Sequence, residues 1–143
     1  MDYELLKEFF LHDEFARQNG IEIVEITEGQ ARTQVRIEPR HLNAGGYVQG
    51  GLLFTLADLA FAAATNSHDT LTVTTTANIT FARGATGGLI FAQAKEVVNH
   101  RRIPFCEVRI TDEAGNLIAF FTASGYRKEG LSPSGHASST HNS

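Results

Sequence analysis

A long apolar segment with one internal acid constrains the fold of this chain more than any other feature. Residues 48–67 read VQGGLLFTLADLAFAAATNS, and Asp58 is the only charged residue among them. A lone carboxylate is costly to bury unless it is paired, hydrogen-bonded or neutralised. The fold must therefore enclose this segment and still give Asp58 polar surroundings.

The apolar segment is predicted to be a helix from Gly50 to Asn66. It is too long for one strand, and its Ala and Leu content favours a helix. A membrane-spanning helix needs about 20 apolar residues and rarely carries a central acid. A helix that is apolar nearly all round must be buried nearly all round, so we expect a central helix enclosed by a sheet.

Six other segments have the composition and alternation of strands, and turns containing Gly, Asn or Asp separate most of them. The predicted strands are Ile21–Thr27, Gln30–Glu38, Leu71–Arg83, Leu89–Asn99, Ile103–Asp112 and Leu117–Lys128. Short turns join the last three, which predicts an antiparallel meander. The expected fold is therefore α+β, with a long central helix wrapped by a curved antiparallel β-sheet.

The two ends of the chain are predicted to differ in order. Residues 1–20 form an N-terminal helix, from Asp2 to about Asn19, that belongs to the same domain as residues 21–130. Residues 131–143 are small and polar, which predicts a disordered tail. His68 and Asp69, directly after the central helix, are expected in a solvated loop.

Composition limits the partners of the protein. The formal net charge of −4 lacks the basic surplus typical of binding to nucleic acid or anionic membranes. The N-terminal segment has no basic-then-apolar signal pattern, so we expect a cytoplasmic protein. Cys106, the single cysteine, reads as a small buried strand residue. No metal or cofactor is expected, because no phosphate-binding loop is present and His136 and His141 are loosely spaced.

Three segments together carry a resemblance to a known family. They are HLNAGGYVQGGLLFTLADLAFAAATNS, TANITFARGA and EAGNLIAFFTASGYR. The chain resembles the hotdog-fold acyl-CoA thioesterases, and within them the PaaI branch of phenylacetate degradation. The most specific part is the spacing of Asn43, Gly50, Gly51 and Asp58, and the resemblance extends over residues 21–128.

The resemblance implies hydrolysis of a coenzyme A thioester to the free acid and coenzyme A. The acyl group would be aryl, arylacetyl or medium-chain. The Gly50 N–H would polarise the thioester carbonyl, and Asn43 would position that carbonyl or the nearby loop. Asp58 would act as a general base on water or attack the carbonyl directly. A hydroxyl on the following strand would hold the water, and alignment favours Thr74, with Thr75 as the alternative.

Further residues are candidates for substrate binding. His41 and Gly51 flank the motif, and Gln49 stands where many relatives have His. Gln can donate and accept hydrogen bonds but cannot titrate. Arg83, Arg101 and Arg102 lie near predicted strand ends, where they would meet the phosphates of coenzyme A or serve as ordinary solvated charges.

The spacing of Gly50 and Asp58 predicts a dimer. Eight residues of helix place them about 12 Å apart along the axis, too far for one thioester carbon to touch both. Two antiparallel helices across a two-fold axis would bring the start of one beside the middle of the other. We therefore expect a homodimer with two interface sites, and the resemblance implies a dimer of dimers, that is, a homotetramer.

Two other functions are compatible with such a fold. One is a non-catalytic module that binds or senses acyl-CoA, although such a module has no need of an acid on the helix. The other is a hydratase or dehydratase, which would carry a catalytic His where Gln49 stands.

Overall fold

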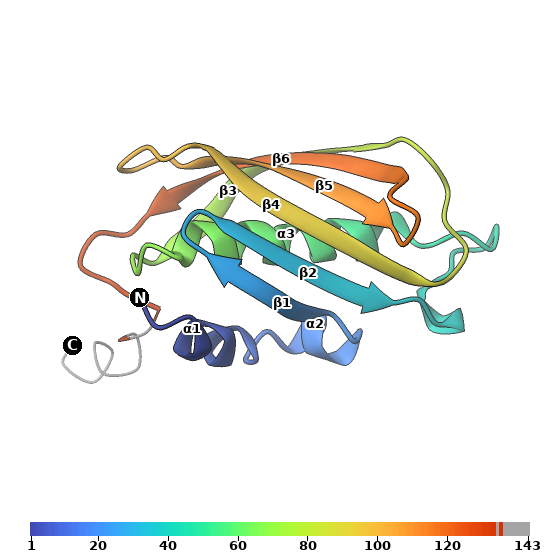
Figure 1. Ribbon diagram of the computed structural model, residues 1–143, viewed down its shortest axis with the longest axis horizontal. Coiled ribbons are helices and arrows are strands. Elements are labelled where there is room, and N and C mark those ends of the chain that lie inside the picture. Colours follow the sequence, from blue (N-terminus) through green and yellow to red (C-terminus); the bar gives the residue numbers. More distant parts are fainter. Residues whose placement is uncertain (134, 136–143) are drawn as a thin grey trace.

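The computed structural model describes residues 1–133 and 135, and within them a six-stranded antiparallel sheet curves around one long helix, α3 (Figure 1). Helix α3 spans Gly50–Asn66, as predicted. The strands are β1 (Glu22–Thr27), β2 (Gln30–Arg36), β3 (Thr72–Phe81), β4 (Leu89–Val98), β5 (Phe105–Asp112) and β6 (Leu117–Arg127). The predicted α+β architecture is confirmed.

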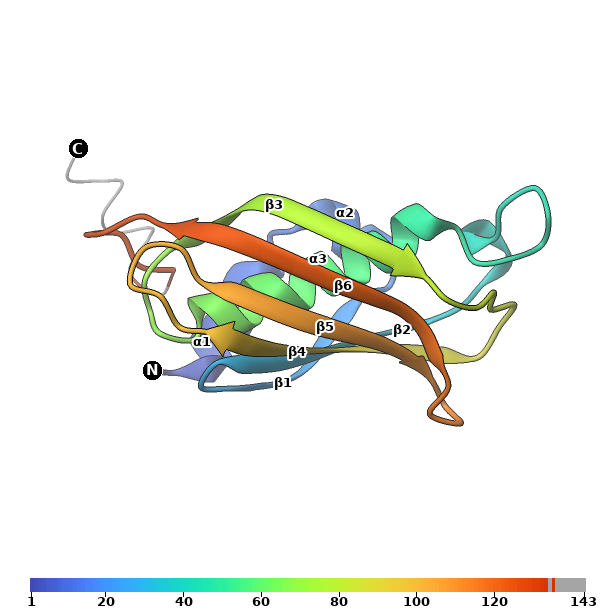
Figure 2. The same cartoon turned by 90° about the horizontal axis from the view of Figure 1, so that it is seen from above.

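The order of strands in the sheet is β1-β2-β4-β5-β6-β3. The predicted meander is confirmed, because β4, β5 and β6 are consecutive neighbours. Strand β3 crosses over to pair with β6, and β2 pairs with β4, so β3 and β1 form the two edges. Figure 2 shows β3 and β6 side by side along α3.

The N-terminal helix differs from the prediction because it is interrupted. It consists of α1 (Tyr3–Phe10) and α2 (Glu14–Gln18). The Asp2 carboxylate caps α1, and the Asp13 carboxylate caps α2 by accepting the Ala16 N–H at 3.1 Å. An aspartate that caps a new helix ends the preceding one, since its side chain replaces a backbone acceptor. The single helix expected over residues 2–19 was therefore wrong.

The core lies between the sheet and α3. Leu56, Ala60 and Phe61 of α3 have no exposed surface, and Val108 and Phe121 of the sheet are equally enclosed. The Thr33 hydroxyl on β2 donates to the Leu56 carbonyl at 2.8 Å, which ties the sheet to the middle of the helix. The curved sheet thus buries the apolar side chains that α3 carries on nearly every side.

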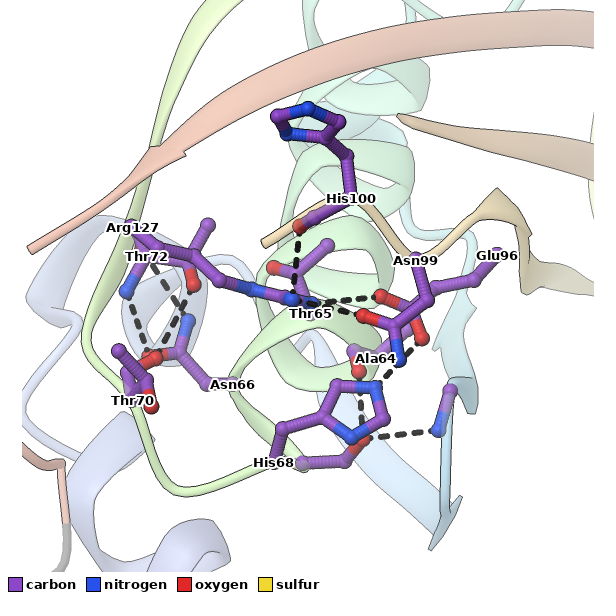
Figure 3. A network of polar contacts seen from close by, with 12 residues as sticks. Ala64, Thr65, Asn66, His68, Thr70, Thr72, Glu96, Asn99, His100 and Arg127 are labelled. Atoms are coloured by element: carbon purple, nitrogen blue, oxygen red, sulfur yellow. Dashed lines mark hydrogen bonds and ion pairs between the residues drawn. The ribbon is translucent and has the colours of Figure 1, made fainter. Parts of the chain in front are cut away.

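Asn66, the last residue of α3, fixes the start of β3 (Figure 3). Its side-chain amide donates to the Ala62 and Thr72 carbonyls at 2.8 and 3.1 Å. Its side-chain oxygen accepts the Thr72 N–H at 3.0 Å. Because Asn66 is buried, these bonds hold the register of β3 against α3.

A buried ion pair also lies near the C-terminal end of α3 (Figure 3). The Arg127 guanidinium donates to Glu96 at 2.9 Å, and both side chains are only 7% exposed. A ring nitrogen of His68 lies 2.6 Å from the second Glu96 oxygen. The expected solvated position of His68 was wrong, since its side chain is 18% exposed and bound to Glu96.

Cys106 is buried in β5, as predicted. Burial and the nearby Glu96 charge raise the pKa of its thiol to about 12, with Arg127 opposing the shift. The thiol therefore stays protonated near neutral pH and is a poor nucleophile.

The chain after β6 returns to the start of β3, where the Leu131 carbonyl accepts the Leu71 N–H at 3.0 Å. Most of the predicted tail, residues 134 and 136–143, including His136 and His141, lies outside the described residues. In the part of the chain that is described, no helix is long and apolar enough to cross a bilayer.

Replacing Phe61 with Ala is expected to destabilise the fold by about 3–5 kcal/mol, because the ring is fully buried and would leave a cavity. Phe15→Ala removes the same atoms from a residue that is 64% exposed, and we expect a change below about 0.5 kcal/mol. Urea unfolding of both variants at one protein concentration measures the difference. Equal effects would contradict the assigned core.

Candidate active site

Asp58 lies in the middle of α3, where its side chain is half-buried and faces the start of β3. The Thr74 hydroxyl donates to the Asp58 carboxylate at 2.8 Å. Burial raises the pKa of Asp58 above its ordinary value, the Thr74 hydrogen bond lowers it in part, and the Asp13 charge adds to the rise. Asp58 thus has the polar partner that its apolar surroundings require, with its second oxygen left for other contacts.

The structure separates the two candidate threonines. Thr74 contacts Asp58, whereas the Thr75 hydroxyl donates to the Ser124 carbonyl of β6 at 3.2 Å. Thr75 therefore links β3 to β6, whereas Thr74 donates a hydrogen bond to the Asp58 carboxylate.

The N-terminus of α3 presents a free donor. Within the residues that the structure describes, the Gly50 N–H has no hydrogen-bond partner. The next amide, Gly51, lies 3.5 Å from the Gln49 side-chain oxygen, which is the outer limit of a hydrogen bond. Helix N-termini combine such unpaired donors with the positive end of the helix dipole. Gln49 is the capping residue here, a role that needs no titratable group.

Asn43 organises the loop that precedes α3. Its side-chain oxygen accepts the N–H groups of Gly45 and Tyr47 at 2.9 and 3.1 Å. Its own N–H donates to the Tyr47 carbonyl at 2.7 Å. Of the two roles expected for Asn43, positioning of the loop is the one that these contacts serve.

A groove of about 500 Å³ lies at the Gly50 end of α3. Asn43, Gln49, Gly50, Phe81 and Arg83 are among its lining residues. The two loops that form it, before α3 and after β3, extend from the same end of the molecule (Figures 1 and 2).

Phe81, at the end of β3, packs directly on Gly50. A methyl group at position 50 would come within 2.8 Å of the Phe81 ring. Glycine is therefore needed for this contact as well as for access to the amide. Sequence reasoning missed Phe81, although its alternation with Ile79 along the strand indicated that both face inward.

His41 is buried and carries structural hydrogen bonds on both ring nitrogens. Nδ1 accepts the Glu38 N–H at 2.9 Å, which leaves Nε2 to donate to the Asn19 carbonyl at 2.9 Å. The His41 carbonyl accepts the Gln49 N–H, so His41 helps to hold the residue that caps α3.

The three candidate arginines are not brought together within one chain. Arg83 lines the groove beside Gly50. Arg101 pairs with Glu129, and the Arg102 carbonyl accepts the Arg127 N–H, which places both at the opposite end of α3. Throughout the described residues, no cluster of three or more His, Cys, Asp or Glu side chains could hold a metal ion.

Comparison with known proteins assigns the class of this protein. A sequence profile of the thioesterase superfamily matches residues 45–119, which are 75 of the 143 residues and include α3, β3 and β4. The chain belongs to this superfamily, and it is a thioester hydrolase with the hotdog fold.

Individual relatives narrow this assignment to the PaaI branch. The acyl-coenzyme A thioesterase PaaI of Escherichia coli is 30% identical over 117 residues, which cover 81% of this chain and 84% of the relative. The structure of E. coli PaaI matches with a TM-score of 0.85 at 27% identity, over 90% of this chain and 94% of that one. A variant of the phenylacetic acid degradation protein PaaI from Thermus thermophilus matches with a TM-score of 0.77 at 31% identity, over 81% and 100%.

Replacing Thr74 with Val is expected to raise the pKa of Asp58 further, because Val cannot donate the hydrogen bond that stabilises the ionised carboxylate. An NMR titration of the labelled Asp58 carboxyl carbon measures the change. Thr76→Val is the control, since Thr76 is exposed and lies opposite Ser124 in the β3–β6 pairing. An unchanged titration in Thr74→Val would show that the hydrogen bond does not act on the carboxylate.

Proposed function

We propose that this thioester hydrolase acts on coenzyme A thioesters, with Asp58, Gly50, Asn43 and Thr74 as its catalytic set. The observation that carries the proposal is the Asp58–Thr74 pair. It is a half-buried carboxylate with a raised pKa, on the helix whose first amide is free in a groove. Carboxylates with perturbed pKa values cluster at functional sites, and the proposed dimer would bring the Asp58 of one chain to the groove of the other.

In the proposed reaction Asp58 is the general base. Thr74 occupies one carboxylate oxygen, and the other holds a water molecule. The water oxygen attacks the thioester carbon as Asp58 takes its proton. The Gly50 N–H stabilises the charge that develops on the carbonyl oxygen. The C–S bond then breaks, the acid is released, and the coenzyme A sulfur takes up the proton.

The substrate class rests on the relatives and on the groove. The E. coli relative is named an acyl-coenzyme A thioesterase and the T. thermophilus relative a phenylacetic acid degradation protein. We propose aryl or arylacetyl groups as the preferred acyl part and medium-chain groups as the second choice. Phe81 offers an aromatic face beside Gly50, and Arg83 offers a cation to the coenzyme A phosphates. Coenzyme A is part of the substrate, and the proposal needs no further cofactor.

The proposed unit is a homodimer. Gly50 and Asp58 lie on one straight helix, about 12 Å apart. Along α3, a stripe that includes Gly51, Thr55, Asp58 and Ala62 is less covered by the protein's own core than the rest of the helix. Strand β3 beside it is an edge strand with an unpaired side. A second copy related by a two-fold axis would cover both and place its Asp58 beside this chain's Gly50.

Pairing of two such dimers into a tetramer is proposed from the family resemblance alone. Within each proposed dimer, Arg101 and Arg102 of one chain would lie nearer the Gly50 end of α3 in the partner chain. Their contribution to coenzyme A binding is therefore proposed across the dimer, whereas that of Arg83 is proposed within one chain.

Asp58→Asn is expected to lower turnover of acyl-CoA esters by about 100- to 10,000-fold, because the amide cannot accept the proton. The same variant should be more stable than the wild type at neutral pH. The raised pKa of folded Asp58 means that stability is lost as the pH rises from the unfolded value of 3.8 through the folded value. Thiol release from a panel of aryl, arylacetyl and medium-chain esters, together with urea unfolding, measures both effects.

Absence of turnover on every ester in the panel, or equal turnover by Asp58→Asn, would contradict the proposal. Tight binding of the esters without turnover would instead support an acyl-CoA sensor. In a single turnover in water labelled with heavy oxygen, an unlabelled first product would identify the nucleophile route. Hydrolysis of an acyl-Asp58 intermediate at its aspartyl carbon would release a first product without label.

A mixture of two inactive variants is expected to recover activity if each site is shared between chains. Gly50→Pro removes the N–H, and proline is well accepted at the first helical position. The extended backbone of Gln49, with ψ 129°, already suits a residue before proline. Equal co-expression of Gly50→Pro and Asp58→Asn should give about a quarter of wild-type activity, because half of the dimers then contain one intact site.

Gly50→Ala is the control for the added atoms, since it keeps the N–H but places a methyl group against Phe81. Its activity relative to Gly50→Pro isolates the role of the amide. If co-expression restores nothing while each variant is folded and dimeric, the sites do not use Gly50 and Asp58 from different chains.

A further inference from the structure

Strand β3 contacts both the middle of α3, at Asp58, and its start, at Gly50, and a regular strand could not do so. Thr74 points inward to Asp58, and Phe81 points inward to Gly50. The two residues are an odd number of positions apart. Side chains of a regular strand alternate with a period of two, so residues separated by an odd number lie on opposite faces.

A bulge at Thr75 resolves this conflict. Thr74 lies opposite Gly125 of β6, and Thr76 lies opposite Ser124, so Thr75 is an extra residue without a partner of its own. Beyond the bulge the inward residues are Ala77, Ile79 and Phe81. The bulge thus shifts the alternation of the strand by one residue.

Gly125 is the residue that lets β3 approach β6 closely at this point. A methyl group on Gly125 would lie 2.6 Å from the Val73 carbonyl oxygen and 3.0 Å from the Thr72 side chain. It would also lie 3.2 Å from the Phe61 ring in the core. The nearest of these atoms belongs to the backbone, so the strand itself would have to move.

The Thr75 hydroxyl holds the bulge from the other side. It donates to the Ser124 carbonyl at 3.2 Å, next to Gly125. Earlier in the chain, Asn66 clamps Thr72 to the end of α3. Thr74 lies between these two fixed points, and its hydroxyl reaches Asp58.

We propose that Gly125 is a positioning residue of the active site, which acts through the Thr75 bulge to aim Thr74 at Asp58 and Phe81 at Gly50. The inference deepens the proposed hydrolase function and rests on it for its catalytic consequence. Gly125 does not line the groove, and the atoms nearest to a methyl group at this position belong to Val73, Thr72 and Phe61, so its proposed role is to set the phase of β3.

Gly125→Ala tests this proposal. We expect kcat to fall about tenfold, the scale of one hydrogen bond to a charged group, and the acid limb of the pH profile to move to higher pH. In an NMR titration the pKa of Asp58 should rise as it does in Thr74→Val. The double variant Thr74→Val/Gly125→Ala should show no further rise, because both changes remove the same contact.

Gly87→Ala is the matched control, since Gly87 lies in the β3–β4 loop and a methyl group there meets nothing within 4 Å. It should leave the titration and turnover at wild-type values. If Gly125→Ala does not fold, Thr75→Val loosens the bulge without adding atoms at position 125, and a smaller shift in the same direction is expected.

A folded Gly125→Ala with the wild-type Asp58 titration would overturn the inference, as would an additive double variant. If Gly125→Ala is unfolded, a wild-type titration in Thr75→Val would overturn it. The titration needs no substrate. A wild-type protein without turnover would therefore refute the proposed hydrolysis of coenzyme A thioesters and leave the result on Gly125 standing.

Discussion

The enclosure of α3 by the curved sheet is the interaction on which the rest of this structure depends. The helix carries so few polar side chains that only a surrounding sheet can bury it. Its buried residues make the core with the inner faces of the strands, and its two ends are held by different groups. His41 and Gln49 support the start, and Asn66 clamps the end to β3.

The enclosure is incomplete along one stripe of the helix, and Asp58, the proposed catalytic acidic residue, lies there. Burial raises the pKa of Asp58, and the hydrogen bond from Thr74 lowers it in part. A carboxylate in this state lowers the stability of the folded protein at neutral pH, which is a common property of catalytic groups. The buried Arg127–Glu96 pair lies at the end of the sheet where β3 begins, and Thr72 of β3 pairs with Arg127 of β6. The acid therefore lies beside a well-fixed strand.

The comparison with the thioesterase superfamily gives this arrangement its chemical meaning. The free Gly50 amide and the hydrogen-bonded Asp58 are on one helix yet too far apart for one reacting carbon. The proposed dimer joins them across two copies. Strand β3 then has three tasks, because it forms the edge of the sheet, carries the partner of Asp58 and ends in the aromatic ring beside Gly50.

The sequence by itself determined the central helix and the strands. Periodicity is a local property, so the central helix and all six strands could be predicted, and the spacing of Asn43, Gly50 and Asp58 pointed to a candidate site. The strand order and the burial of His68 beside Glu96 were decided by tertiary structure, because each depends on hydrogen bonds or packing between distant segments. The break at Asp13 is instead local, since the Asp13 side chain caps the N–H of Ala16, and sequence reasoning missed it. Likewise, the choice of Thr74 over Thr75 and the place of Gly125 in the bulge required the folded molecule, because both depend on contacts between separate elements. Shifting the alternation of a strand by one residue moves every side chain beyond that point to the opposite face of the sheet, and only contacts across the sheet decide where such a shift occurs.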